Sequence, residues 1–505
     1  MKKKNFIARM IENRLGGYER QINSVDVQLP SKIGKECNVA IIGAGLAGLS
    51  AAIILAERGF KVDIYEKDGF MGGKVGSWPH TFSDGFNTQI EHGFHAFFRQ
   101  YYNLLRILDK VDASKNLIPI DDYLIMTLDQ GNYSFKNINT TPILNLFSLM
   151  KTKVYTLGEV IINPKFNRML TLLQYDPRKT FQNFDHATFN DFANMVGLNN
   201  QMRLMFTTFA RAFFAEAHLI SMAELIKSFH FYFLSNDHGL LYDVLNDDFD
   251  VTLLQPIRKF LKKHGTKILL KNPVNEIIKE EQKFTIQNRS YDYLIFASDI
   301  GGTQKIVANS KSLYQSYPDF SNQIKKQKIS QKYAVLRIWI DKDIDSKLPF
   351  FIFTDAIKIL DSVTTYHRME KSSRDWAASN GGGIFELHSY ALPDHISDPG
   401  EIRSQFLSEF EAYFPKLKGY KIKYEYLQVR NDFTAFHTNL YANRASYNTQ
   451  VPNLYLAGDW IKIPCPAMLM EAAATSALYS VNEILKTEKV QQEPIYSVPL
   501  RGIFA

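Results

Sequence analysis

Three glycines with the spacing GxGxxG stand between a short apolar run and a helix-forming run, and few folds begin in this way. The apolar run 38–42 predicts a buried strand, and residues 49–58 predict a helix. Gly43 would permit a tight turn, Gly45 would let the backbone approach a pyrophosphate, and Gly48 would let the helix pack closely on the strand. The spacing therefore predicts a Rossmann-like α/β fold that binds a dinucleotide at the N-terminus of this helix.

An acidic residue follows the next predicted strand. Residues 61–65 predict that strand, and Glu66 lies 18 residues beyond Gly48. A carboxylate at this place can accept hydrogen bonds from both ribose hydroxyls of an adenosine, whereas it would repel a 2′-phosphate. The pattern argues against NADP as the ligand. A solvated residue at the end of a strand is the alternative interpretation of Glu66.

A second glycine motif comes shortly afterwards, at Gly72, Gly73 and Lys74. These glycines would let another backbone segment lie against the cofactor, with the Lys74 ammonium near the phosphates. Nicotinamide enzymes rarely need such a second contact, so the motif favours a flavin. An ordinary glycine turn is the alternative.

The C-terminal part of the chain carries a complementary strand, glycine and acid. Residues 454–456 predict a buried strand before Gly458 and Asp459. Gly458 permits a close approach, and Asp459 can accept a hydroxyl hydrogen from a sugar-alcohol chain such as ribitol. The helix that begins near Met468 would point its positive end at an electron-rich ring. A strand-end aspartate that caps a helix is the alternative.

These motifs, in this order and spacing, resemble the FAD-dependent amine oxidase/phytoene desaturase superfamily. The resemblance implies a non-covalent FAD, with the backbone of Val274 against the adenine and Ala297 at the end of a strand that crosses near the cofactor. The cofactor-binding residues that it implies are Gly43, Ala44, Gly45, Leu46, Ala47, Gly48, Glu66, Lys67, Gly72, Gly73, Lys74, Gly93, Phe94, Val274, Ala297, Gly458, Asp459 and Met470.

A narrower resemblance involves residues 90–98 and 101–104, together with 229–234 and 498–502. These segments are similar to carotene desaturase and isorenieratene synthase-type enzymes, which act on carotenoid polyenes. The resemblance implies an apolar polyene substrate and a desaturation, isomerisation or end-ring aromatisation by hydride transfer to flavin. The particular carotenoid, the bond and the terminal electron acceptor stay open.

The predicted substrate side is rich in aromatic residues, which make up 13% of the whole chain. An apolar tunnel for a long hydrocarbon is the functional interpretation. Ordinary helix core is the alternative. The aromatic residues concerned are Phe94, Phe97 and Phe98, and in segment 203–234 Phe206, Phe209, Phe213, Phe214, Phe229, Phe231, Tyr232 and Phe233.

Hydride removal from a hydrocarbon needs no polar catalytic group, because the flavin performs the difficult step. A base could still remove a proton from a cationic intermediate, and His92 and His95 are the candidates. Packing, or a hydrogen bond to the backbone, is the alternative for both. No carboxylate or cysteine set completes a metal site with them, so we expect no metal.

The order of the predicted elements indicates a discontinuous cofactor domain. The α/β pattern returns in 251–300 and 454–485, whereas 111–245 is largely helical in pattern and 330–392 predicts a second sheet. We therefore expect a basic N-terminal extension (1–36), a Rossmann-like FAD-binding domain (37–110, 246–300 and 445–486), an α+β substrate-binding domain (111–245 and 301–444) and a C-terminal tail (487–505).

The charge and hydropathy patterns bear on partners and location. The net charge of +7, from 59 basic and 52 acidic residues among 505, suits an anionic cofactor or an anionic membrane surface rather than nucleic acid. No run of about 18 apolar residues predicts a membrane span, and the basic start is not followed by the apolar region of a signal peptide. We expect a cytoplasmic enzyme that is peripheral on the inner face of the membrane.

Two other functions compete with carotenoid oxidation. A soluble flavin amine oxidase would need an aromatic cage beside the flavin and a polar entrance. A non-catalytic binding protein on the same scaffold, as in Rab GDP-dissociation inhibitors, would have no need of the phosphate turn, Glu66 and Asp459.

Overall fold

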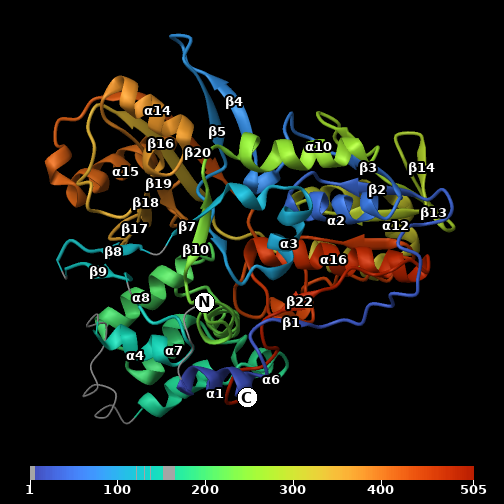
Figure 1. Cartoon of the computed structure of the whole chain (residues 1–505), viewed down its shortest axis with the longest axis horizontal. Helices are drawn as coiled ribbons and strands as arrows, with labels where there is room; N and C mark the ends of the chain where they lie inside the picture. Colours follow the sequence, from blue (N-terminus) through green and yellow to red (C-terminus); the bar gives the residue numbers. More distant parts are fainter. Residues whose placement is uncertain (1–5, 121, 130, 137, 152–164) are drawn as a thin grey trace.

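A five-stranded parallel sheet forms the right-hand part of the molecule in Figure 1. The computed structural model describes residues 6–120, 122–129, 131–136, 138–151 and 165–505. The two strands predicted at 38–42 and 61–65 are confirmed, because short apolar runs suit buried parallel strands. The sheet order is β11 (Lys267–Leu269), β3 (Lys61–Tyr65), β2 (Asn38–Ile42), β15 (Tyr293–Phe296) and β21 (Leu454–Leu456), with every neighbouring pair parallel.

Helix α2 (Leu46–Glu57) follows the glycine-rich turn and is almost completely buried. It begins three residues earlier than predicted, so the third glycine of the motif lies inside its first turn. Its apolar residues are spread all round the helix, and it packs against α3 (Tyr102–Lys110), α10 (Gln255–Lys263) and α16 (Leu469–Thr487). These contacts fix the N-terminus of α2 at the carboxyl ends of the parallel strands.

A second, mixed sheet of seven strands lies to the left in Figure 1. Its neighbouring strands are antiparallel except β17 and β8, which run parallel. Helices α14 (Lys371–Asn380) and α15 (Pro399–Tyr413) pack beside it. The order is β20 (Ile422–Arg430), β16 (Tyr333–Ile340), β19 (Gly383–Ser389), β18 (Ser362–Thr365), β17 (Phe351–Thr354), β8 (Leu124–Met126) and β9 (Tyr133–Ser134).

The prediction that residues 111–245 are largely helical is wrong in part. This segment contains four short strands: β8 and β9, which extend the second sheet, and β7 (Leu117–Ile120) and β10 (Tyr242–Leu245), which form a three-stranded sheet with β6 (Phe97–Phe98). They are two to four residues long. Strands of this length are too short to show a recognisable alternation of apolar and polar residues. Their conformation is therefore decided by pairing with strands that are distant in the sequence.

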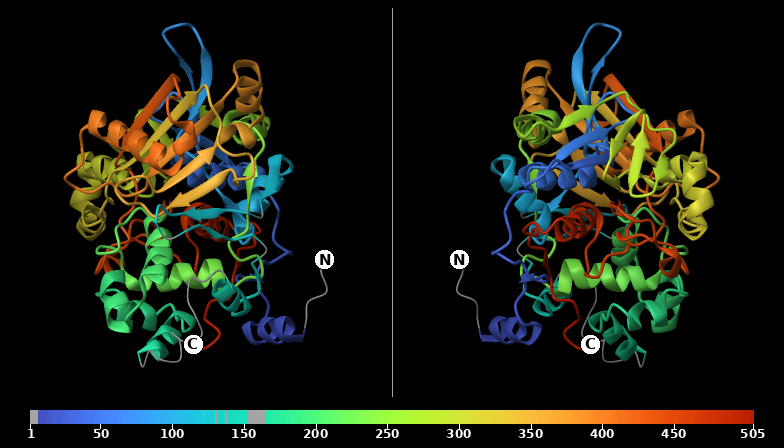
Figure 2. Two further views of the ribbon diagram at one scale, coloured as in Figure 1. Left: turned by 90° about the vertical axis from the view of Figure 1, so that its left-hand side faces the viewer. Right: turned by 90° about the vertical axis from the view of Figure 1, so that its right-hand side faces the viewer.

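The rest of that segment forms a helical layer in the lower part of Figure 1. The N-terminal helix α1 (Phe6–Leu15) and the C-terminal tail lie at the bottom of the molecule in Figure 2, where Ile11 and Leu15 of α1 pack against Ile143 and Ile503. The helical layer consists of α4 (Leu144–Lys151), η3 (Phe166–Leu173), α6 (Lys179–Phe184), α7 (Phe189–Val196), α8 (Asn200–Arg211), α9 (Met222–Phe229) and the π-helical turn η4 (His230–Leu234).

None of the helices in the described ranges is long and apolar enough to cross a membrane. The division into domains given above stays a prediction.

The remaining elements of the fold are short. They are β1 (Arg20–Gln21) paired with β22 (Tyr496–Ser497), the hairpin β4 (Ser77–Thr81) and β5 (Asn87–Glu91), the strands β12 (Ile278–Glu280), β13 (Lys283–Ile286) and β14 (Arg289–Tyr291), the helices α11 (Ile300–Asn309), α12 (Lys311–Ser316) and α13 (Pro318–Lys325), and the turns η1 (Gly73–Val75), η2 (Ser114–Asn116), η5 (Asp250–Leu254), η6 (Tyr366–Arg368), η7 (Pro415–Leu417) and η8 (Tyr441–Asn443).

A buried carboxylate, Glu471 of α16, ties this helix to the first turn of α3. It accepts hydrogen bonds from the backbone and side chain of Asn103 (2.9 and 2.8 Å) and from the backbone of Leu104 (3.0 Å). Because Glu471→Ala leaves these donors unsatisfied, we expect it to lower the free energy of unfolding by about 3 kcal/mol, measured by urea denaturation. The exposed Lys486→Ala on the same helix is the control; equal stability of the two variants would contradict this role.

Candidate flavin and substrate site

One cavity of about 500 Å³ joins the carboxyl ends of the parallel strands to the second sheet and the helical layer. Ligands of open parallel sheets bind outside the carboxyl ends of the strands, so this is the expected place for a cofactor. Of the residues predicted to hold FAD, all line the cavity except Ala44 and Gly48.

The three glycines of the first motif serve two different purposes. Gly43 has a φ of +108°, and a Cβ there would lie 2.6 Å from the carbonyl oxygen of Ala297. A Cβ at Gly48 would lie 2.0 Å from the carbonyl oxygen of Gly43. The close packing of the backbone therefore requires a glycine both at 43 and at 48. A Cβ at Gly45 would meet only the Cα of Gly73, at 4.0 Å, and Gly45 itself lines the cavity. The open space at Gly45 is therefore a cradle that a larger side chain would fill.

The second glycine motif lies directly against the first. The backbone N–H of Gly72 donates to the carbonyl of Ala44 at 2.7 Å, and Gly45 and Gly72 form a short parallel bridge. A Cβ at Gly73 would lie 3.0 Å from the Cα of Gly45. Two glycine backbones thus meet at one point of the cavity wall, and this arrangement fits the pyrophosphate of a dinucleotide.

Glu66 ends β3 and is mostly buried. Its Oε2 accepts the backbone N–H of Ala44 at 2.8 Å, and its Oε1 accepts that of Asp68 at 2.9 Å. Burial raises the pKa of Glu66, and these two hydrogen bonds oppose the rise. Each oxygen keeps a further lone pair, so the carboxylate can still accept two ribose hydroxyls. The neighbouring Lys67 lines the cavity with a largely exposed side chain.

Lys74 and Asp459, which come from opposite ends of the sequence, form an ion pair. The Lys74 Nζ lies 3.2 Å from Oδ2 of Asp459 and 4.0 Å from the ring centre of Phe433. Burial lowers the pKa of Lys74, but the charges of Asp459 and Asp432 outweigh it and leave the pKa raised. From the sequence we expect Lys74 near the phosphates and Asp459 at ribitol, and no sequence pattern indicates that the two form a pair.

The opposite end of the cavity is aromatic. Seven of the eight aromatic residues singled out in 203–234 line it, whereas Phe231 is buried in the core and does not. Of the three earlier phenylalanines, Phe94 and Phe98 line it and Phe97 does not. The second sheet and its neighbours add rings that the sequence analysis missed: Tyr123, Phe135, Tyr242, Phe351 and Phe353. The phenylalanine alternation in β17 was the only sequence signal for these.

The two candidate histidines lie in the cavity wall just after β5. The Nε2 of His92 is 2.7 Å from the hydroxyl of Tyr333, and burial lowers the pKa of His92. The Nδ1 of His95 is 2.7 Å from the carbonyl of Gly93, which can only accept, so this nitrogen carries the proton. Burial lowers the pKa of His95 to about 4. Within the described ranges no group of histidine, cysteine and acidic residues could hold a metal.

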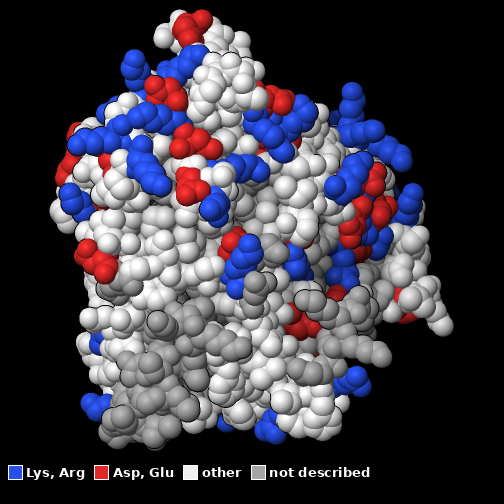
Figure 3. Space-filling view, turned by 60° about the vertical axis from the view of Figure 1, so that its left-hand side comes forward, with Lys and Arg blue, Asp and Glu red and all other residues white. Residues whose placement is uncertain are grey.

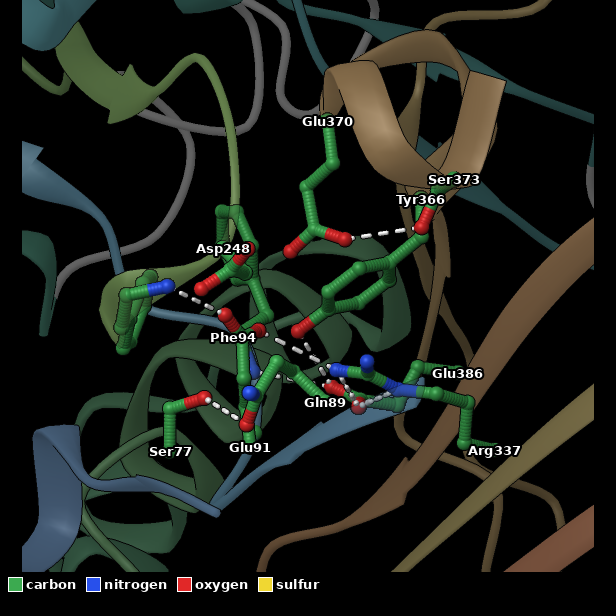
Figure 4. A network of polar contacts seen from close by, with 12 residues as sticks. Ser77, Gln89, Glu91, Phe94, Asp248, Arg337, Tyr366, Glu370, Ser373 and Glu386 are labelled. Carbon is green, nitrogen blue, oxygen red and sulfur yellow. Dashed lines mark hydrogen bonds and ion pairs between the residues drawn. The ribbon is translucent and has the colours of Figure 1, made fainter. Parts of the chain in front are cut away.

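A buried charge network, shown in Figure 4, includes Glu91, which directly precedes His92 in the sequence. The Arg337 guanidinium on β16 contacts Glu91 at 3.1 Å and Glu386 on β19 at 2.8 Å. Glu386 also accepts the hydroxyl of Tyr366 and the backbone N–H of Phe94, both at 2.9 Å. This network was not predicted from the sequence. Its only local signal is the single charged residue, Arg337 or Glu386, inside each of two apolar strands that pair directly.

A glycine-rich turn at the carboxyl ends of parallel strands, with a cavity beside it, is typical of dinucleotide-binding proteins. The chain belongs to the family described as flavin containing amine oxidoreductase, whose sequence profile matches residues 46–485. The flavin cofactor that this family implies agrees with the cradle at Gly45 and the carboxylate of Glu66.

Similar proteins indicate the type of flavin oxidoreductase within this family. The chain is 30% identical to a carotenoid phi-ring synthase from Streptomyces griseus, over 92% of this chain and 90% of that protein. It is 30% identical to a zeta-carotene desaturase from Synechocystis sp., over 47% and 50% of the two chains. Cyclohexylamine oxidase from Brevibacterium oxydans IH-35A shares the fold, with 13% identity, a TM-score of 0.61 and coverage of 89% and 100%. The chain is a flavin-dependent oxidoreductase of the carotene desaturase type.

The different roles of Gly45 and Gly48 can be separated by substitution. We expect Gly45→Val to fold with normal stability but to purify without flavin, because its side chain fills the cradle. We expect Gly48→Val to yield little folded protein, because its Cβ would collide with the Gly43 carbonyl. Absorbance at 450 nm per chain and thermal unfolding measure the two effects. A Gly45→Val protein with full flavin content would show that this turn does not face the cofactor.

Proposed function

We propose that this chain is an FAD-dependent oxidoreductase that acts on a carotenoid, by desaturation, isomerisation or aromatisation of an end ring. The single observation that carries the proposal is the cavity, which runs from the glycine-rich turn to a wall of aromatic side chains. The similar proteins support this proposal, because two of them are named for carotenoids: a carotenoid phi-ring synthase and a zeta-carotene desaturase.

FAD is the flavin that these residues suit best, because they can hold an adenosine and a pyrophosphate as well as the ring. Glu66 would accept the ribose hydroxyls, and the backbones at Gly45 and Gly72 together with the N-terminus of α2 would hold the pyrophosphate. Asp459 would accept a ribitol hydroxyl. When bound, the flavin supplies the oxidising power by taking up a hydride.

The aromatic end of the cavity suits a hydrocarbon better than an amine. Among the described residues of α8, α9 and η4, no acidic side chain lines the cavity. An ammonium group would lose its hydration there without a partner, at a cost of several kcal/mol. A polyene needs only packing and the exclusion of water, which the rings of Phe209, Tyr232 and Phe233 can provide.

A membrane face would give such a substrate access to the protein. Exposed apolar side chains gather on α1, the helical layer and the C-terminal tail, and exposed basic residues lie among them. Along the lower edge of the molecule in Figure 3, the charged side chains that are visible are Lys or Arg. Aromatic and apolar residues with a basic rim suit an anionic lipid surface on the inner side of the membrane. The membrane face comprises Phe6, Arg9, Met10, Phe147, Lys165, Arg168, Leu170, Met195, Arg501 and Phe504.

The substrate class can be tested by anaerobic reduction of the flavin. We expect its absorbance at 450 nm to bleach when carotenoids are added in detergent micelles and to stay unchanged with primary amines, because only the apolar chain suits the aromatic wall. Empty micelles are the control. Bleaching by amines without bleaching by carotenoids would favour an amine oxidase.

The membrane face can be tested by sedimentation with vesicles that contain anionic lipids. We expect the triple variant Phe6→Ser, Met10→Ser, Phe504→Ser to bind at least about tenfold more weakly than the unmodified protein, because three exposed apolar side chains are lost. Tyr314→Ser with Ile357→Ser removes two exposed apolar side chains elsewhere and serves as the control. Equal binding by both variants, or no binding of the unmodified protein at low salt, would contradict the proposal.

A further inference from the structure

We propose that His388, held in place by Glu386, is the base that accepts a proton from the substrate after a hydride has left to the flavin. The inference rests on the proposed carotenoid oxidation. Loss of a hydride leaves a carbocation, and a new C=C bond forms only when a neighbouring carbon gives up a proton. The C–H electron pair of that carbon becomes the π bond, the flavin gains two electrons with the hydride, and the imidazole becomes an imidazolium.

The position of His388 suits this role. It lies on β19, its ring is part of the cavity wall, and its Nε2 is 2.9 Å from Oε1 of Glu386. A Cβ at Gly93 would lie 3.2 Å from Cε1 of His388, so the glycine leaves room for the ring beside the flavin-site segment. The contact of Nε2 with Glu386 is an ion-pair contact rather than a hydrogen bond. Among the residues that the structure describes, none forms a hydrogen bond with Nδ1, which leaves this nitrogen for the substrate proton.

Glu386 is fixed from three further directions (Figure 4). Arg337 Nε donates to its Oε2 at 2.9 Å, and Tyr366 and the backbone of Phe94 donate to its Oε1. Burial alone would raise the pKa of Glu386, but the Arg337 charge and the contact with His388 lower it to about 2. Glu386 therefore stays ionised next to the imidazole, where a carboxylate can stabilise an imidazolium that forms during the reaction.

Two further buried carboxylates, Glu370 and Glu91, lie on the other side of Arg337. Burial and the Glu91 charge raise the pKa of Glu370 far above its usual range. The Arg337 guanidinium contacts both Glu91 and Glu386, and the charge of Arg337 helps to keep Glu386 ionised beside His388.

The other two histidines in the cavity wall are less suitable. The Nε2 of His92 is already in contact with the hydroxyl of Tyr333, and burial lowers the pKa of His92. His95 has a free Nε2, but burial lowers its pKa to about 4 and no carboxylate lies within ion-pair distance of its ring in the described part of the chain. Of the three, only His388 directly contacts a carboxylate that is itself fully buried and fixed.

The decisive variant is His388→Gln, with His367→Gln as a matched control. His367 is also buried and pairs with a carboxylate, Asp343, at 3.1 Å, but it does not line the cavity. We expect His388→Gln to lower the rate of carotenoid product formation about 100-fold or more, and His367→Gln to leave it unchanged. Added imidazole should restore part of the rate in His388→Ala, which a purely structural role would not allow.

Rates of the two His388 variants within about threefold of the unmodified enzyme would overturn the inference, as would a larger loss in His95→Gln than in His388→Gln. Failure of the unmodified enzyme to act on any carotenoid would instead overturn the proposed function. A second measurement does not depend on turnover. The ¹⁵N chemical shifts of His388 in the substrate-free protein should give a protonated Nε2 and an unprotonated Nδ1, and the reverse tautomer would overturn the inference.

Discussion

The buried guanidinium of Arg337 joins the end of β5 to the second sheet, next to residues of the cavity wall. It reaches Glu91 at the end of β5 and Glu386 in the second sheet, and the same Glu386 accepts the backbone N–H of Phe94. A buried cation that loses one of its partners is strongly destabilising, so these contacts hold together as a set. The segment between Glu91 and Phe94, which carries His92 and Gly93 in the cavity wall, is therefore held rigidly against the second sheet.

The cavity has two chemically different ends because the parallel sheet lies at one end and the helical layer at the other. On the side of the parallel sheet, glycine backbones, the N-terminus of α2 and the carboxylates that follow the strands provide hydrogen bonds. On the side of the helical layer, aromatic rings line the wall and the described helices add no acidic group. A charged, polar cofactor and an apolar substrate can thus occupy one space without competing for the same contacts.

The local parts of this site were predictable from sequence, and the long-range parts were not. The strands at 38–42 and 61–65, the glycine turn and Glu66 follow from short patterns whose meaning does not depend on the rest of the fold. The pairing of Lys74 with Asp459 joins residues 385 positions apart. Local periodicity contains no information on such a contact.

The residues that the second sheet contributes to the cavity wall could not be predicted for the same reason, because they depend on long-range contacts. His388 and Glu386 lie in one largely apolar strand. Their role can be recognised only from the strand register, which places Arg337 opposite Glu386. The strands β8 and β9 are too short to be recognised before the pairing of β8 with β17, and of β9 with β8, is known. The aromatic segment 203–234 was identified from composition, but only the structure separates rings that line the cavity from rings such as Phe231 that fill the core.

The most direct test of the central claim, that one cavity holds both the flavin and the polyene, is a crystal structure of the flavin-loaded protein with a bound carotenoid. The account predicts density for the dinucleotide along Gly45 and Gly72, and for the polyene along Phe209 and Phe233, with its reacting end beside Gly93 and His388. A carotenoid bound elsewhere on the protein, or a flavin that itself fills the aromatic end of the cavity, would contradict it.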